Sequence, residues 1–191
     1  MSDYGKGLDQ ERFCDLTGLT KSELIETCTG DYPLLPGIHL PSEIERGKRL
    51  SFADALAVEV ARSIQFELDI PLSRALRLTS YAGGIEGFLD YRPNDQVVGR
   101  LLTDYWMAVV NLRSTHLENG ARSDVAISGH YVGPLHQTMA EISNRFAKEE
   151  GDFDADPSRM LLINISAANR RLRQRATSYG IGVYENEFAA E

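Results

Sequence analysis

The chain has 191 residues, enough for one large domain or two small ones. Its net charge of -8 argues against a general polyanion binder, although local basic clusters matter more than the sum. Cys14 and Cys28 are not in Cys-x-x-Cys spacing, the N-terminus lacks the layout of a signal peptide, and no run approaches the ~20 apolar residues of a membrane span. We therefore expect a reduced, cytoplasmic protein without a membrane segment.

The first elements in the chain are a pair of short helices. A helix is predicted over residues 8–16, with Phe13 and Leu16 inward, and Gly18 interrupts it. Thr20 then stands three residues before Glu23, which is the spacing of a capping box at the start of a second helix over residues 20–29. Two short helices joined by a tight glycine turn are the layout of a helix-turn-helix.

A proline-rich segment follows, and it leads into a longer helical pattern. Prolines within residues 32–41 forbid a helix or a central strand, so we expect an extended excursion that returns through residues 43–49 as a wing. From residue 53 to 64 apolar residues recur at three- and four-residue spacing, which predicts a helix of about four turns. Asp69-Ile70-Pro71 ends that helix and begins another at Leu72.

Residues 12–78 resemble the DNA-binding domain of the MerR-like winged helix-turn-helix proteins. The resemblance lies in four features that occur in the family's order. The turn is Gly18-Leu19-Thr20, and a Leu-Pro step follows at Leu35-Pro36. The wing ends at Gly47-Lys48-Arg49-Leu50-Ser51-Phe52 with Asp54 near the start of the next helix, and the break before the last helix is Asp69-Ile70-Pro71-Leu72. It implies a mostly helical winged domain over residues 1–82 whose partner is double-stranded DNA. The remaining half of the chain resembles no family known to us.

Candidate DNA-binding residues come from three elements of this domain. The start of the second helix favours phosphate through its backbone N–H groups, the wing is basic, and the last helix carries arginines off its apolar face. These candidates are Thr20, Lys21, Ser22, Arg46, Lys48, Arg49, Arg74 and Arg77.

The second helix also departs from the family pattern. Where members usually carry an arginine and aromatic residues, this chain reads Ile25-Glu26-Thr27-Cys28, and Glu26 and Asp31 would repel a duplex. This leaves an alternative in which the fold serves as a protein-protein adaptor in a larger assembly.

Residues 83–103 form a connector rich in glycine and turn residues, and the family's long dimerising helix is absent there. In residues 104–191 the spacing of apolar residues changes, and strand patterns appear among the helical ones. Strands are predicted over 104–112 and 124–132 around an Asn119-Gly120 turn, followed by a helix from Pro134 to Glu149. A near-continuously apolar strand over 160–165, expected to be central, and a helix from Ser166 to Gly180 complete the order β-β-α-β-α. The fold class is therefore predicted to be α+β.

Several clusters in this half contain side chains that could bind or react with a ligand. The arginines of the last helix (Arg170, Arg171, Arg173 and Arg175) form either a surface for phosphate or an acidic partner, or a solvated face that neutralises the acidic residues 149–156. The acidic segment lacks the register of a calcium loop. Surface histidines are favoured over a metal site for His116, His130 and His136, and core packing over a ligand platform for Tyr105, Trp106 and Tyr131.

No nucleophile elbow or phosphate loop occurs, so no catalytic residue, metal or cofactor is assigned and the chain is not expected to be an enzyme. The leading hypothesis is a DNA-binding transcription regulator, a repressor or an autoregulatory factor. A homodimer is expected, because one short recognition helix reads few base pairs. The C-terminal domain would dimerise, sense a ligand or receive a protein partner.

Overall fold

The computed structural model of the chain describes residues 7–28, 35, 47, 49–81, 83–91, 103–118, 121–149 and 155–181. These residues form helices and a three-stranded antiparallel sheet, so the fold class is α+β as predicted. The chain divides into two compact units, one made of Met1–Leu89 with Ile165–Glu191 and the other of Asp90–Asn164. The sheet unit is therefore an insertion between two parts of a helical unit.

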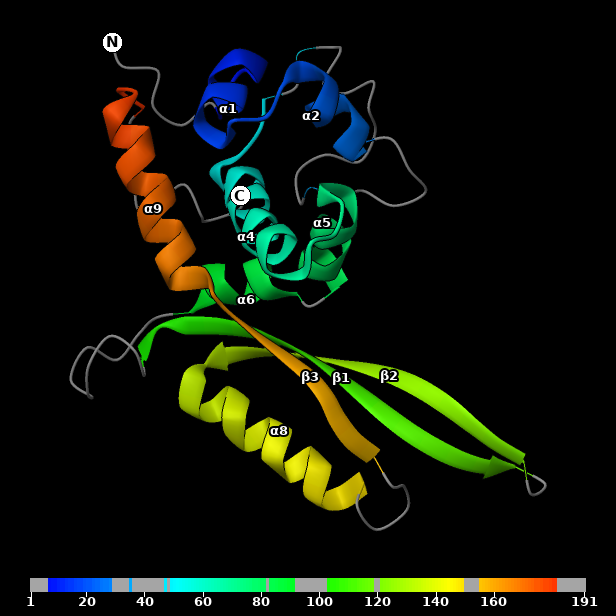
Figure 1. The fold of residues 1–191 in the computed structure, drawn as a ribbon. Helices are drawn as coiled ribbons and strands as arrows, with labels where there is room; N and C mark the ends of the chain where they lie inside the picture. The colour runs from blue at the N-terminus through cyan, green and yellow to red at the C-terminus, as the bar shows by residue number, and fades with distance from the viewer. Residues whose placement is uncertain are drawn as a thin grey trace. The chain divides into compact units, whose positions relative to one another are not determined.

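The helical unit is built around one long helix. This helix, α4, contacts three others, and Figure 1 shows them around it. Its middle is buried almost all the way round, which explains why apolar residues and alanines fill it. The helices that belong wholly or mostly to this unit are α1 (Gln10–Thr17), α2 (Lys21–Cys28), α4 (Phe52–Leu68), α5 (Leu72–Tyr81), α6 (Gly84–Asp90) and α9 (Ile165–Ser178).

The ends of α4 follow from local sequence. Ser51 and Asp54 form a capping box, in which the Ser51 hydroxyl accepts from the Asp54 N–H and the Asp54 carboxylate accepts from the Ser51 N–H. Asp69 ends the helix in the left-handed conformation, with φ 51°, and Pro71 precedes the next helix. The break at residues 69–71 is thus confirmed.

The sheet unit has the predicted element order. It consists of β1 (Tyr105–Glu118), β2 (Ala121–Pro134), α8 (Leu135–Glu149) and β3 (Ala155–Asn164). The hairpin register runs from Tyr105 opposite Pro134 to Glu118 opposite Ala121, so the connection is the expected pair Asn119-Gly120, which itself lies outside the described residues. The helix predicted from Pro134 to Glu149 is confirmed, except that it begins one residue later, at Leu135.

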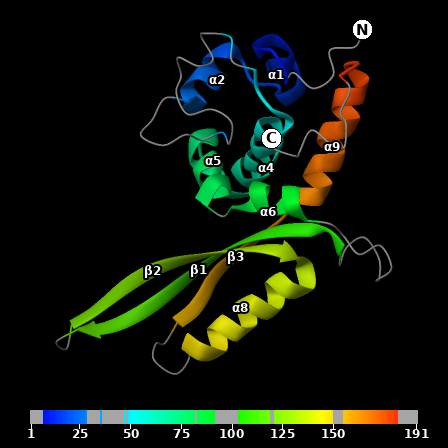
Figure 2. The same cartoon turned by 180° about the vertical axis from the view of Figure 1, so that it is seen from behind.

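The position of β3 in the sheet was predicted wrongly. The strand order is β2-β1-β3, so β1 is central and β3 lies at an edge. An apolar run alone cannot distinguish a central strand from an edge strand that is covered by a helix. Here α8 packs on the sheet (Figure 2). Its Ile142 and Met139 form a cluster with Ala108, Val110 and Leu162.

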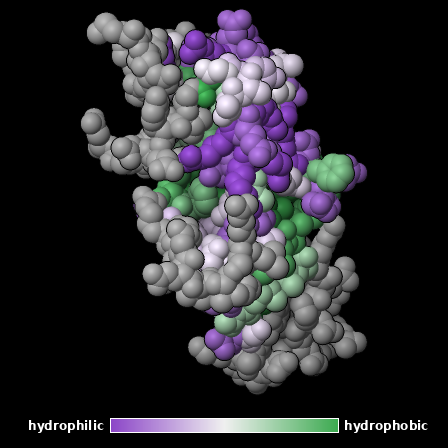
Figure 3. Space-filling view, turned by 90° about the vertical axis from the view of Figure 1, so that its left-hand side faces the viewer, coloured by the Kyte–Doolittle hydropathy of each residue, from purple (hydrophilic) through white to green (hydrophobic). Residues whose placement is uncertain are grey.

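The last helix belongs to the helical unit. The sequence-based division at residues 83–103 grouped residues 165–191 with the sheet, whereas α9 contacts α4 and α1. Its buried face carries Ile165, Ala168, Leu172 and Ala176. The other face is polar, and Figure 3 shows hydrophilic side chains gathered on the side where α9 lies.

Among the described residues, no helix is both long enough and apolar enough to cross a membrane.

Candidate nucleic-acid interface

The helices α1 and α2, joined by a tight glycine turn, have the layout expected for a helix-turn-helix. Asp9 caps the start of α1 by accepting from the Arg12 N–H at 2.8 Å. Gly18 ends it with φ 67°, a conformation that glycine adopts without steric cost, and its N–H donates to the Cys14 carbonyl at 2.7 Å. Phe13 and Leu16 are fully buried, as predicted.

A capping box defines the start of α2. The Thr20 N–H and hydroxyl both donate to Oε2 of Glu23, at 2.7 Å and 2.8 Å, and the Glu23 N–H donates to the Thr20 hydroxyl at 3.2 Å. Hydrogen bonds from the Thr20 backbone and side chain lower the pKa of the Glu23 carboxyl, because they stabilise its ionised form. The predicted capping box is therefore confirmed, and the Glu23 charge is engaged at the helix start.

The exposed face of α2 carries charges of both signs. Lys21 and Ser22 are exposed in its first turn, whereas Leu24 and Thr27 are buried. Glu26 is exposed one turn further on. A phosphate would therefore meet a lysine and backbone N–H groups at the start of the helix and a carboxylate nearer its middle.

Of the three basic residues expected in the wing, only Arg49 can be placed. Arg46 and Lys48 lie outside the described residues, as does most of the wing itself. Arg49 is exposed, and its Nη1 donates to the Gly7 carbonyl at 3.1 Å. The neighbouring Leu50 pairs with Leu8 through an antiparallel bridge, so residues 49 and 50 are held beside the segment that leads into α1.

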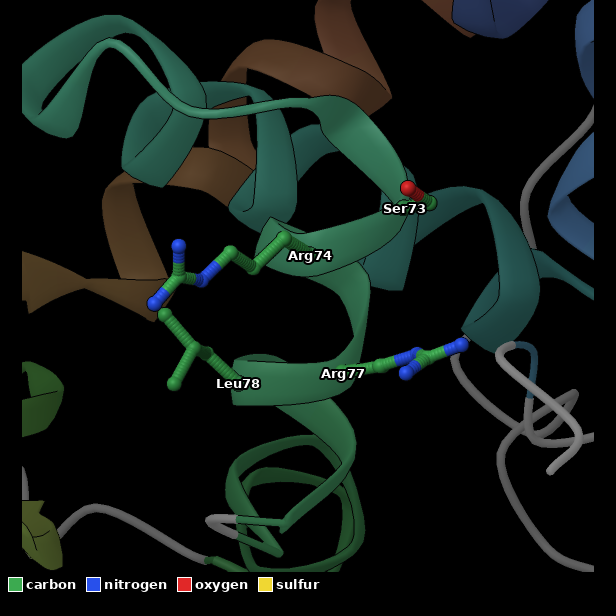
Figure 4. Close-up of a pocket in the computed structure, with 4 residues that line it drawn as sticks. All are labelled: Ser73, Arg74, Arg77 and Leu78. Carbon is green, nitrogen blue, oxygen red and sulfur yellow. The ribbon is translucent and has the colours of Figure 1, made fainter.

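The arginines of α5 are exposed and line a hollow. This hollow has a volume of about 430 Å³ and is bordered by Ser73, Arg74, Arg77 and Leu78. Figure 4 shows Arg74 and Leu78 pointing to one side of α5 and Arg77 to the other. Within the described part of the chain, neither guanidinium has a hydrogen-bond or ion-pair partner, and α5 contacts α2. Two exposed cations, unpaired within the described part of the chain, therefore lie on a helix that adjoins α2.

Two arginines of α9 have a partner that the sequence did not indicate. Nε of Arg171 and Nη1 of Arg175 both donate to the carboxylate of Glu59 on α4, at 3.1 Å and 3.2 Å. The Glu59 side chain is only 9% exposed, so its charge is compensated by these guanidiniums rather than by water. For Arg171 and Arg175, two of the four arginines considered in the sequence, the partner is therefore Glu59 rather than the acidic residues 149–156.

Among the side chains that the structure describes, the remaining candidates of the sheet unit do not converge on a site. Tyr131 packs against the cluster under α8, and Tyr105 stacks at a tilt on Tyr91 with ring centroids 5.1 Å apart. Burial lowers the pKa of His130, and the exposed His136 lies on α8. No group of three or more metal-ligating side chains occurs among the described residues.

Comparisons of the chain with models of known protein families, with curated proteins and with solved structures find no match.

Proposed function

We propose that the chain is a DNA-binding transcription regulator of the cytoplasm, a repressor that reads duplex DNA with its winged helix-turn-helix. The observation that carries the proposal is the helix-turn-helix itself: a tight glycine turn leads to a capped α2 whose first turn exposes Lys21 and Ser22. Helix N-termini favour phosphate through their N–H groups and dipole. In this proposal Thr20, Lys21 and Ser22 approach the duplex first.

The arginines of the wing and of α5 would supply the phosphate contacts. Arg49 is exposed, and Arg74 and Arg77 are exposed cations on the helix that adjoins α2. Because these two point to opposite sides of α5, they suit successive charges on an extended backbone better than a single small anion (Figure 4). Arg46 and Lys48 complete the proposed set on sequence grounds.

The sheet unit is proposed to form a homodimer or to receive a ligand or protein partner. Twofold symmetry would double the contact with DNA. In support, β2 and β3 are the edge strands of the described sheet, and edge strands are templates for pairing with another chain. Sedimentation equilibrium of the full chain measures the stoichiometry, and a monomer at all concentrations would argue against a dimer.

Selection of bound duplexes from a random 30-base-pair pool tests DNA binding directly. The affinity of the enriched duplex is then measured over a salt series for the full chain and for Lys21→Met, Arg49→Met and Arg74→Met. Each lost phosphate contact should reduce the slope of log K against log salt by about 0.9. Arg171→Met is a charge-matched control, since Arg171 binds Glu59.

Glu26 provides a test of the opposite sign. Because its exposed carboxylate would face phosphates, Glu26→Gln should strengthen binding to the same duplex. Unchanged binding by Glu26→Gln would place the duplex elsewhere on the unit.

The adaptor hypothesis remains as a second candidate because of this carboxylate. Glu26 on α2 and the net charge of -8 would suit a basic protein surface. Affinity capture from a nuclease-treated lysate separates the two functions: a partner that is retained without nucleic acid and lost in Glu26→Lys supports the adaptor.

A further inference from the structure

The turn of the helix-turn-helix is held by arginines from two other helices. Nη2 of Arg62 on α4 donates to the Gly18 carbonyl at 2.8 Å, and Nη1 of Arg175 on α9 donates to the Leu16 carbonyl at 2.9 Å. Carbonyls at the end of a helix lack partners within it, and a cation at that end also interacts favourably with the helix dipole. Both guanidiniums therefore act as C-terminal caps of α1.

Arg175 is in turn held by Glu59. The same Nη1 that reaches Leu16 lies 3.2 Å from Oε2 of Glu59, whose side chain is 9% exposed. A buried carboxylate restricts the positions available to its guanidinium, because separating the two would leave an uncompensated charge. A chain of contacts thus runs from the middle of α4 through Arg175 to the end of α1.

Arg171 provides an internal comparison. It shares Glu59 with Arg175, at 3.1 Å, and also donates to the Ser63 hydroxyl at 3.3 Å. Its hydrogen bonds are thus with α4, whereas those of Arg175 reach both α4 and α1. The two arginines carry the same charge on the same helix and differ in whether they touch the helix-turn-helix.

The turn matters because α2 is short and follows it directly. A helix of eight residues is marginal by itself, so its direction depends on the contacts around it. Lys21 lies three residues after Gly18. A change in the backbone at Gly18 would therefore displace the N-terminal turn of α2 more than the rest of that helix. That first turn is the part proposed to meet the duplex.

We propose that Arg175, fixed by Glu59, is a positioning residue for α2: the C-terminal helix sets the turn of a motif encoded at the other end of the chain. The contact with duplex DNA rests on the proposed function, whereas the control of the turn does not. Arg175 itself touches no phosphate in this arrangement. Its loss should weaken binding through the geometry of α2 and leave the number of phosphate contacts unchanged.

The test compares Arg175→Met with Arg171→Met in the full chain. Amide hydrogen exchange of residues 16–24 is measured without DNA, and the affinity and salt slope are measured with the duplex enriched by the wild type. Arg175→Met should speed exchange in this segment at least about tenfold, the factor expected for the loss of one charge-assisted hydrogen bond. If the first turn of α2 keeps its wild-type position in one molecule in ten, the affinity of Arg175→Met for the duplex should fall about tenfold. The slope of log K against log salt should stay unchanged.

Arg171→Met is expected to change neither the exchange of residues 16–24 nor the affinity by more than about twofold, since its contacts lie on α4. Equal effects of the two variants would overturn the proposal, because both lose an ion pair to Glu59. A reduced salt slope in Arg175→Met would overturn it too, by making Arg175 a phosphate contact.

Two further experiments apply if Arg175→Met does not fold or if no duplex is enriched. If Arg175→Met loses its helical circular dichroism, Arg175→Lys replaces it, since a shorter ammonium keeps the charge near Glu59 but not the reach to Leu16; unchanged exchange in that variant would refute the proposal. If the wild type enriches no duplex, the proposed function fails, and the exchange measurement still decides whether Arg175 controls the turn.

Discussion

The ion pair between Glu59 and the C-terminal helix should contribute measurably to stability, and Glu59→Gln removes it with almost no change in volume. The carboxylate is 9% exposed, whereas the side chains of Arg171 and Arg175 are 51% and 34% exposed. Breaking a buried pair costs about 3–5 kcal/mol and breaking an exposed pair about 0–1 kcal/mol. With one buried and two partly exposed partners, we expect about 1 kcal/mol for each guanidinium and about 2 kcal/mol in total.

Urea unfolding followed by far-ultraviolet circular dichroism measures this loss. Glu67→Gln is the matched control, because Glu67 is exposed near the end of the same helix, and it should change stability by less than about 0.5 kcal/mol. In a double-mutant cycle, Glu59→Gln and Arg175→Met should show a coupling of about 1 kcal/mol. A loss below about 0.5 kcal/mol for Glu59→Gln, or strictly additive variants, would refute the reasoning.

Three further predictions concern the helix-turn-helix. Gly18→Ala should destabilise the unit by about 1 kcal/mol in urea unfolding, since φ is 67° there and a Cβ would lie 3.1 Å from Nη1 of Arg62; a stability equal to wild type would contradict this strain. Thr20→Ala should cost about 1 kcal/mol at neutral pH. The pKa of the Glu23 carboxyl is lower in the folded chain than its ordinary value of 4.5. The stability that the ionised Glu23 contributes through Thr20 is therefore fully present above pH 4.5, and it is lost as the pH falls through the pKa of the folded chain. The urea midpoints of wild type and Thr20→Ala should accordingly converge in acid. Burial raises the pKa of the Cys14 thiol above 9.0, so iodoacetamide at pH 7.5 should modify it slowly in the folded chain and quickly in urea, as peptide mass spectrometry can measure; equal rates would argue against burial.

The elements that were predicted correctly are those whose signals are local. The capping box of Thr20 and Glu23 joins residues three apart, and the break at Asp69 to Pro71 needs only its own backbone. The β-hairpin depends on the two residues of its turn and on alternation in the flanking strands. Each of these signals acts over a few residues, so it can be seen without any knowledge of the rest of the fold.

The candidate site was predicted in part. The exposure of Lys21, Arg74 and Arg77 follows from their positions off the apolar faces of their helices. That α5 contacts α2, and so brings these cations near the motif, is a property of helix packing. Nothing in the local pattern of either helix specifies that contact.

The amino-acid sequence alone determined the order of most helices and strands and which side of each is apolar, because capping, turn geometry and periodicity are short-range. It missed α6, which lies in the expected connector 83–103, and it predicted β1 and β2 shorter than they are. Only the tertiary structure decided that β1 is the central strand, that α9 packs on α4 and α1, and that Glu59 is the partner of Arg175. Glu59 and Arg175 are separated by 116 positions, and a charge attracts any opposite charge. The buried surfaces of the helices select which pair meets, and that selection exists only once they have packed.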